Sequence, residues 1–122
     1  TPLYSSAASD VYKRQVSALS TKANGDAWDG GGNAPDLYVV VSDGSSKEKT
    51  ASVRDSLLAK LDHTTSITVE LGDQLSLEVW DEDIAFNDEV GKTTIVITRD
   101  ALESGILKVS FGRVDNLILV LE

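Results

Sequence analysis

The stretch VWDEDIAFNDEVG, residues 79–91, is the part of the chain that decides the fold. Just before and into it, Leu75, Leu77 and Val79 alternate with polar and aromatic residues. This period of two is typical of a strand with one buried face, so the sequence predicts a strand over residues 75–80. The strand then gives way to an acidic loop.

Five acids crowd this loop: Asp81, Glu82, Asp83, Asp88 and Glu89. Asp81 and Asp83 are two positions apart, so on an extended backbone their side chains point the same way and their charges repel. Calcium suits such a loop, because it takes six to eight oxygen ligands at roughly 2.3–2.6 Å. The other interpretation is a solvated acidic turn, which needs no metal.

A second acidic loop lies upstream, in DAWDGGGNAPDLYVVV, residues 26–41. Its glycines allow positive φ angles, which let backbone carbonyls curl inward, and carbonyls are legitimate calcium ligands. The Val-rich and Tyr-containing end of the stretch predicts a strand over residues 37–42.

The two loops together resemble the C2 domain, the calcium-dependent membrane-binding module found in protein kinase C and synaptotagmin. PDLYV, residues 35–39, stands where that family has Ser/Pro-Asp-Pro-Tyr-Val. Residues 79–91 match the family pattern Val-x-Asp-x-Asp, four or five residues, Asp, two residues, Gly. The resemblance covers residues 16–122, with Leu37 in place of the usual Pro and an unusually long first loop.

This resemblance implies a calcium site made by both loops, since loops of a sandwich gather at its ends. The implied ligands are the carboxylates of Asp29 (or Asp26 in its place), Asp36, Asp81, Asp83 and Asp88, with the Glu82 carbonyl. The implied partners are an anionic membrane surface, reached through calcium, or another protein.

Both acidic loops contain large apolar residues that could contact a membrane. Ile84 and Phe86 occupy the tip of the second loop, and Trp28 lies in the first. One interpretation is shallow insertion into a lipid interface, where Trp is favoured, after calcium has cancelled the local charge. The other is that Phe86 and Trp28 fold back and pack over the base of their loops.

Length, composition and charge exclude several classes of protein and site. The 122 residues predict one domain, and the absence of Cys excludes disulfides, thiol nucleophiles and zinc–thiolate sites. The net charge of −9 and the lack of a basic run argue against nucleic-acid binding. No apolar run approaches the roughly 20 residues of a membrane-spanning helix, so we expect a soluble or peripheral, monomeric module of a longer chain.

The first residues look foreign to the domain. Residues 5–15, SSAASDVYKRQ, match the translation of a common transposon-type sequencing adapter. We therefore expect residues 1–15 to be a non-native scar of metagenomic assembly and residues 16–122 to be the domain. Residues 16–19 would then be the end of a first strand whose native beginning is missing.

The rest of the chain predicts an all-β fold: an antiparallel, eight-stranded, C2-like Greek-key sandwich. Residues 55–63 look irregular, with one helical turn through Leu57, Leu58 and Leu61. A short helix capped by Thr98 should end at Gly105. The other expected strands are residues 49–53, 66–71 (with Ile67, Val69 and Leu71 inward), 92–98, 106–111 and 117–121.

Enzymatic activity is not expected. His63 is the only histidine, and no nucleophile elbow, phosphate loop or His-based zinc motif occurs. A carboxylate pair for glycoside hydrolysis needs one acid in an apolar pocket, whereas these acids lie in polar loops. The alternative to membrane binding is a calcium-stabilised structural or adhesion sandwich of a larger microbial protein, with no role for lipid.

Overall fold

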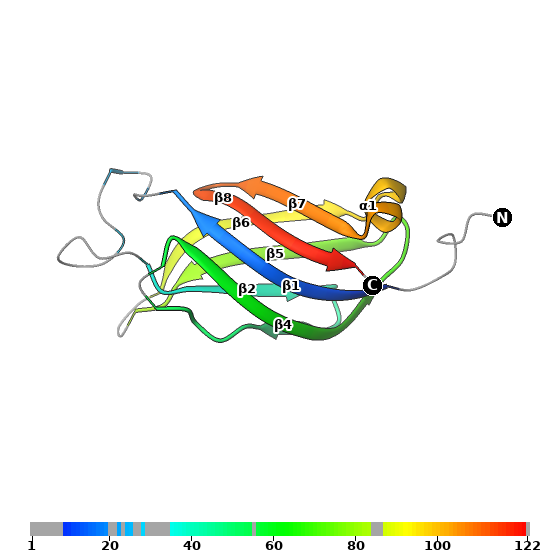
Figure 1. Ribbon diagram of the computed structural model, residues 1–122, viewed down its shortest axis with the longest axis horizontal. Helices are drawn as coiled ribbons and strands as arrows, with labels where there is room; N and C mark the ends of the chain where they lie inside the picture. Colours follow the sequence, from blue (N-terminus) through cyan, green and yellow to red (C-terminus); the bar gives the residue numbers. More distant parts are fainter. Residues whose placement is uncertain are drawn as a thin grey trace.

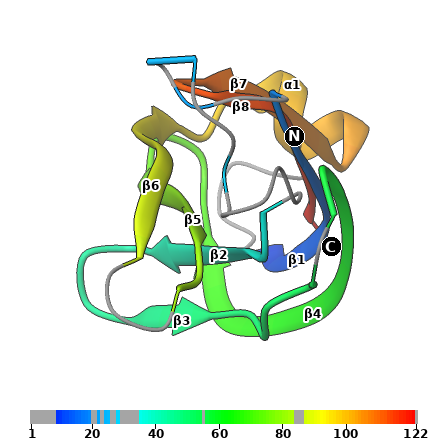
Figure 2. The ribbon, with the colours of Figure 1, turned by 90° about the vertical axis from the view of Figure 1, so that its left-hand side faces the viewer.

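The computed structural model describes residues 9–19, 22, 24, 25, 28, 35–54, 56–83 and 87–121. Eight antiparallel strands form two four-stranded sheets that pack face to face (Figures 1 and 2). The all-β, eight-stranded sandwich predicted from sequence is confirmed. The first sheet has the order β4 (Leu58–Val69), β1 (Ser9–Ala18), β8 (Val114–Leu121), β7 (Ile106–Phe111). The second has the order β3 (Lys47–Lys49), β2 (Leu37–Ser42), β5 (Gln74–Asp81), β6 (Asp88–Val96).

The core lies between the two sheets. Leu75, Leu77 and Val79 of β5 are fully buried, as their alternation predicts, and Leu117 and Leu119 of β8 are buried with them. Each such side chain stabilises the fold by roughly 1.5–3 kcal/mol when it leaves water. The period-2 pattern of the sequence thus decides which face of each strand turns inward.

Strand β2 is covered on both faces. Val39 and Val41 belong to the core, while Tyr38 on the opposite face is also buried. The Lys49 ammonium lies 4.5 Å from the centre of the Tyr38 ring, a distance typical of a cation–π contact. Tyr38 is thereby fixed at the start of a central strand, close to where the second acidic loop returns.

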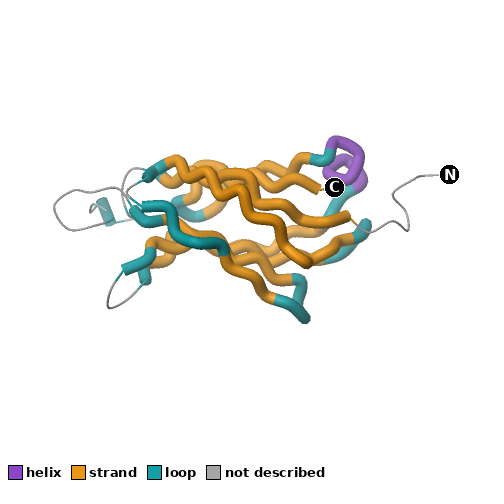
Figure 3. The backbone as a smooth tube through the Cα atoms, turned by 60° about the horizontal axis from the view of Figure 1, so that its bottom comes forward, coloured by secondary structure: helices purple, strands orange, loops and turns teal. Residues whose placement is uncertain are grey.

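A short helix, α1 (Arg99–Ser104), connects β6 to β7. As predicted, Thr98 caps it by accepting a hydrogen bond from the Ala101 backbone N–H. Gly105 ends it with φ 74°, a conformation that glycine adopts without strain. Figure 1 shows α1 at the end of the sandwich opposite the one where β1 finishes, and Figure 3 shows the helix (purple) at one end of the strands. Within the described residues, no helix is long and apolar enough to cross a membrane.

The prediction of an irregular segment at residues 55–63 is wrong beyond residue 57. The chain enters β4 at Leu58, and residues 58–60 pair with β1 instead of forming a helical turn. Helix-like spacing of the leucines is overridden here by hydrogen bonding to a strand more than 40 positions away. Leu71, expected to point inward, follows β4 in a turn and is 39% exposed.

The strand expected at residues 49–53 is shorter and earlier in the structure, because β3 ends at Lys49. The next residue, Thr50, is buried, and its hydrogen bonds to Val39 replace the strand pairing that ends at Lys49. Its hydroxyl oxygen accepts from the Val39 N–H at 3.0 Å, while its own N–H donates to the Val39 carbonyl at 2.9 Å. Val53 then returns to bridge Leu37.

Strand β1 runs across the boundary that we expect at residue 15. Its residues 9–15 pair with β4 on one side and β8 on the other, and Val11 is fully buried in the core. Backbone pairing and an apolar inward residue are open to a segment of any origin, so they do not test where residues 9–15 come from. The foreign origin of residues 1–15 therefore stays a prediction.

Four strand ends meet at the end of the sandwich opposite α1. β1 finishes there at Ala18, β2 begins at Leu37, β5 finishes at Asp81 and β6 begins at Asp88. Asp36 at the end of the first acidic loop and Asp81 at the start of the second, more than 40 residues apart in sequence, thus lie at the same end of the fold.

Candidate metal centre

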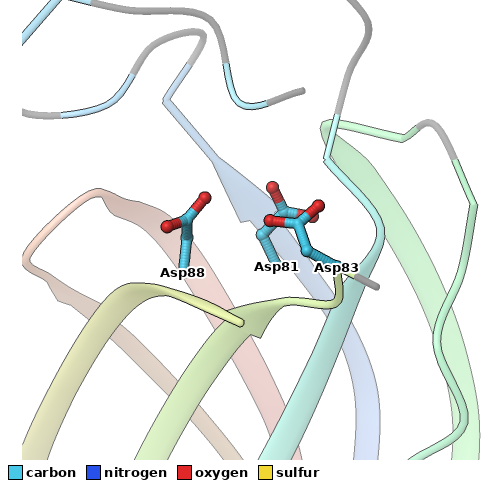
Figure 4. A group of neighbouring side chains, drawn as sticks. All are labelled: Asp81, Asp83 and Asp88. Carbon is cyan, nitrogen blue, oxygen red and sulfur yellow. The ribbon is translucent and has the colours of Figure 1, made fainter. Parts of the chain in front are cut away.

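Three of the predicted ligands come together at this end. Asp81, Asp83 and Asp88 each offer a carboxylate oxygen, and these oxygens lie within 4.8 Å of one another. Figure 4 shows Asp81 and Asp83 side by side at the end of β5, with Asp88 facing them from the start of β6. We call these residues the acidic trio. Their carboxylates project toward the loop end, away from the sheet.

Asp81 is the buried member of the trio, with no exposed surface. Its Oδ1 accepts a hydrogen bond from the Asp36 backbone N–H at 2.9 Å, and the Asp36 carbonyl accepts from the Glu82 N–H at 2.9 Å. Asp36 thus holds the base of the second loop through its backbone. Among the described residues, its carboxylate is not part of the close group formed by the trio.

Asn87 shapes the loop between Asp83 and Asp88. Its Oδ1 accepts from the Asp83 backbone N–H at 3.0 Å, and its Nδ2 donates to the Tyr38 hydroxyl at 2.9 Å. Burial, opposed by this hydrogen bond, raises the pKa of Tyr38 above its ordinary value of 10.0, so the hydroxyl is protonated at neutral pH. Sequence reasoning missed Asn87, although an amide just before the last Asp of the loop is a usable signal.

A lysine reaches the trio from the first loop. The Lys22 Nζ lies 2.8 Å from the Asp88 Oδ2. The hydrogen bond to Asp88 raises the pKa of Lys22, and the charges of Asp88, Asp83 and Asp81 act in the same direction against partial desolvation. Sequence reasoning missed this residue too, although Lys22 is the only basic residue between positions 16 and 46.

Trp28 requires a correction as a membrane-contact residue. Its side chain is 3% exposed and belongs to the core, and its indole N–H donates to the Leu19 carbonyl at 2.8 Å. Of the two interpretations, the structure shows the packed one, because an apolar ring with a satisfied N–H gains more from the core than from water. We therefore leave Trp28 out of the proposed membrane contact.

The remaining predicted site residues are either outside the acidic trio or outside the described part of the chain. Glu82 is exposed, and its carboxylate accepts a hydrogen bond from the Ser52 hydroxyl, while the role expected of its carbonyl stays a prediction. Asp26, Asp29, Ile84 and Phe86 lie outside the described residues.

The donor chemistry of the trio fits calcium. All three groups are carboxylates, the hard oxygen donors that calcium prefers over the nitrogen and sulfur donors of zinc sites. Asp81 and Asp83 approach from one strand end and Asp88 from the neighbouring strand, so a cation held among them would join the two sides of the loop.

Comparison with known proteins identifies the family that this geometry resembles. The family model of the C2 domain matches residues 11–110. A calcium-bound structure of the two tandem C2 domains of extended synaptotagmin 2 superposes with a TM-score of 0.67 at 17% identity, covering 100% of this chain and 46% of that one.

Two plant proteins are similar in sequence. Synaptotagmin-4 of Arabidopsis thaliana is 37% identical over 107 residues, which are 83% of this chain and 19% of that protein. Synaptotagmin-5 of Arabidopsis thaliana is 40% identical over 72 residues, which are 56% of this chain and 13% of that protein. The chain therefore spans less than a fifth of the curated relatives it matches.

Proposed function

Since this chain belongs to the C2 domain family, we propose that it is a calcium-binding module that attaches to anionic phospholipid membranes, or to a protein partner, when calcium is present. C2 domains are non-catalytic modules, in keeping with the expectation that this chain is not an enzyme.

The observation that carries the proposal is the acidic trio. Three carboxylates whose oxygens lie within 4.8 Å repel one another, and this repulsion is relieved when a cation is held among them. Asp81 is locked by the Asp36 N–H, and the Asp83 backbone is locked by Asn87, so two of the three ligands are positioned in advance. Such positioning lowers the entropic cost of binding an ion.

The charge of the whole chain explains why membrane binding should depend on calcium. A net charge of −9 is repelled by anionic lipid headgroups. When bound, calcium would supply positive charge at the loop end and a coordination site for an anionic headgroup. We include Ile84 and Phe86 in the proposal as residues of the loop tip that enter the lipid interface.

Thermal unfolding of the 122-residue chain in chelator and in millimolar calcium tests the metal site. A ligand present at a hundred times its dissociation constant stabilises the native state by about 2.7 kcal/mol, which raises Tm by several degrees in a domain of this size. We expect this rise with calcium and little with magnesium, which demands a more regular octahedral site. An identical Tm in all three conditions would refute calcium binding.

Liposome pelleting tests the membrane role. We expect the chain to pellet with phosphatidylserine-containing vesicles in calcium, and to remain in the supernatant in chelator or with phosphatidylcholine alone. Phe86→Ser should weaken pelleting, whereas Val96→Ser, a matched change at an exposed apolar residue beside α1, should not. A calcium-induced rise in Tm without pelleting would support the structural or adhesion module instead.

A further inference from the structure

Lys22 brings a positive charge to the place where a metal ion would be bound. Its Nζ is 2.8 Å from the Asp88 Oδ2, and the side chains of Lys22 and Asp88 are 29% and 36% exposed. The charges of Asp83 and Asp81 also act on the ammonium group. The contact is made with Asp88, where one carboxylate oxygen is taken up by the ammonium group, while Asp83 and Asp81 act on Lys22 only through their charge.

The first loop offers no second residue for this role. Lys22 is the only basic residue in the 31 positions from 16 to 46, a range that covers the whole connection between β1 and β2. Lys92, on β6, forms an ion pair with Glu89 (Nζ to Oε1, 3.5 Å), and its ammonium group lies over the Trp80 ring. The charge of Lys22 is thus the local counter-charge that the first loop contributes.

We propose that Lys22 is the built-in counter-ion of the acidic trio and competes with calcium for Asp88. This inference rests on the proposed calcium site and deepens it, because it names the residue that sets the affinity of that site. An ammonium group and a calcium ion repel each other when both lie at contact distance from the Asp88 carboxylate. Lys22 therefore leaves Asp88 when the ion enters, and the energy of the ion pair is lost from the binding affinity.

The structure leaves Lys22 room to move. An open surface cavity of about 270 Å³ adjoins the trio and is lined by Lys22, Asn24, Trp28, Asp88, Glu89 and Arg113. Trp28 is anchored in the core and to the Leu19 carbonyl, so the segment that carries Lys22 stays tied to the sandwich. The displaced side chain can rotate into this cavity and remain close enough to return when calcium leaves.

The test compares the parent with Lys22→Gln, Lys22→Arg and Lys108→Gln. Lys108→Gln is the control for charge, since Lys108 is exposed and lines the groove beside α1, at the opposite end of the sandwich. Calcium affinity is measured by calorimetric titration at low ionic strength, and Tm is measured in chelator. We expect Lys22→Gln to bind calcium about fivefold more tightly, the size of a surface ion pair, while Lys22→Arg and Lys108→Gln match the parent.

The chelator melt gives a readout that needs no calcium. Without the charge of Lys22 the repulsion among the three carboxylates is less compensated, so Lys22→Gln should lower Tm by about 2–4 °C, and Lys22→Arg should retain the Tm of the parent. The loss should disappear in 1 M salt, where the Debye length is about 3 Å.

The outcomes separate this inference from the proposed function. Calcium binding that is equal in parent and Lys22→Gln would overturn the inference and leave the calcium site intact. Calcium binding by Lys22→Gln but not by the parent would support it in its strongest form. If no variant binds calcium, the proposed function fails; the counter-ion role then stands only if the chelator melt shows the Lys22-specific loss, and is overturned otherwise.

Discussion

The backbone N–H of Asp36 donates a hydrogen bond to the buried Oδ1 of Asp81 at 2.9 Å, joining the end of the first acidic loop to the start of the second. Their strands pair next to this contact, where Leu37 lies opposite Asp81. Asp81 is therefore an acceptor that holds two strands in register as well as a member of the acidic trio. The backbone of Asp36, unlike its side chain, is part of this structural link.

Removing the partly exposed carboxylate of Asp83 should abolish the response to calcium. Asp83→Ala deletes one of the three proposed ligands without removing either partner of the Asp36–Asp81 hydrogen bond, so the fold should survive and the calcium-induced rise in Tm should vanish. Thermal melts in chelator and calcium provide the measurement. Asp100→Asn in α1 is the control and should retain the full rise; a preserved rise in Asp83→Ala would sink the site assignment.

Asp36→Ala should have a weaker effect than Asp83→Ala. The substitution keeps the backbone N–H that binds Asp81, so Tm in chelator should stay close to that of the parent. Because the Asp36 carboxylate is not part of the close group that we propose as ligands, we expect calcium affinity to fall by less than in Asp83→Ala. Calorimetric titration of both variants gives the comparison. An equal loss of calcium affinity would mean that the Asp36 carboxylate binds the ion as directly as the trio does.

Trp28→Phe should destabilise the fold without weakening membrane binding. The change removes the indole N–H that donates to the Leu19 carbonyl in a buried setting, at a cost of about 1 kcal/mol or a few degrees in Tm. Trp80→Phe is a matched control, because the Trp80 N–H donates to Glu78 on a half-exposed face. Reduced pelleting of Trp28→Phe at unchanged Tm would restore Trp28 as a membrane contact.

Gly91→Ala should lower the free energy of unfolding by about 1–3 kcal/mol, as overpacking does. A Cβ at this position would lie 2.9 Å from the Phe111 Cδ2 and 2.9 Å from the Phe111 carbonyl oxygen. The Phe111 carbonyl oxygen belongs to the backbone and cannot rotate away, so β6 and β7 must move apart at this point. Chemical denaturation measures the effect, with Thr94→Ala on the exposed face of the same strand as control; an unchanged midpoint for Gly91→Ala would contradict it.

Asp43 should titrate below the ordinary Asp value of 3.8. The backbone N–H groups of Ser46 and Ser45 donate to its Oδ1 at 2.7 and 2.8 Å, and they lower the pKa of this exposed carboxylate. A depressed pKa in the folded state means that the stabilisation is present above pH 3.8 and is lost as the pH falls through the folded value. Carbon-13 NMR titration of the Asp43 carboxyl should give a midpoint below 3.8, and a midpoint at or above it would refute the turn geometry.

Sequence reasoning succeeded where a pattern is local. The alternation at Leu75, Leu77 and Val79 predicted a strand whose inward face the structure confirms, and the Thr98 cap with Gly105 predicted α1. Both signals depend on residues within a few positions of one another. The same local reasoning placed Asp81, Asp83 and Asp88 in one loop as ligands, and the structure brings these three together.

It failed where distant segments decide the local structure. Residues 58–61 form a strand because β1 offers its backbone, and Trp28 is buried because Leu19 and the core receive it. No residue pattern in the sequence indicates that β1 pairs with residues 58–61 or that the Leu19 carbonyl accepts from Trp28. The contacts of Lys22 and Asn87 were missed because their partners, Asp88 and Tyr38, lie 66 and 49 positions away, although each residue has a local signal of its own.

The sequence by itself determined the class of the fold, the inward face of its strands and the carboxylates of the second loop. These follow from hydrophobic periodicity and from donor chemistry, both of which are properties of neighbouring residues. Only the tertiary structure decided that the Asp36 backbone locks Asp81 and that Lys22 faces Asp88. The physical reason is that hydrogen bonds and ion pairs act over a few ångströms in space, and folding alone brings those atoms within range.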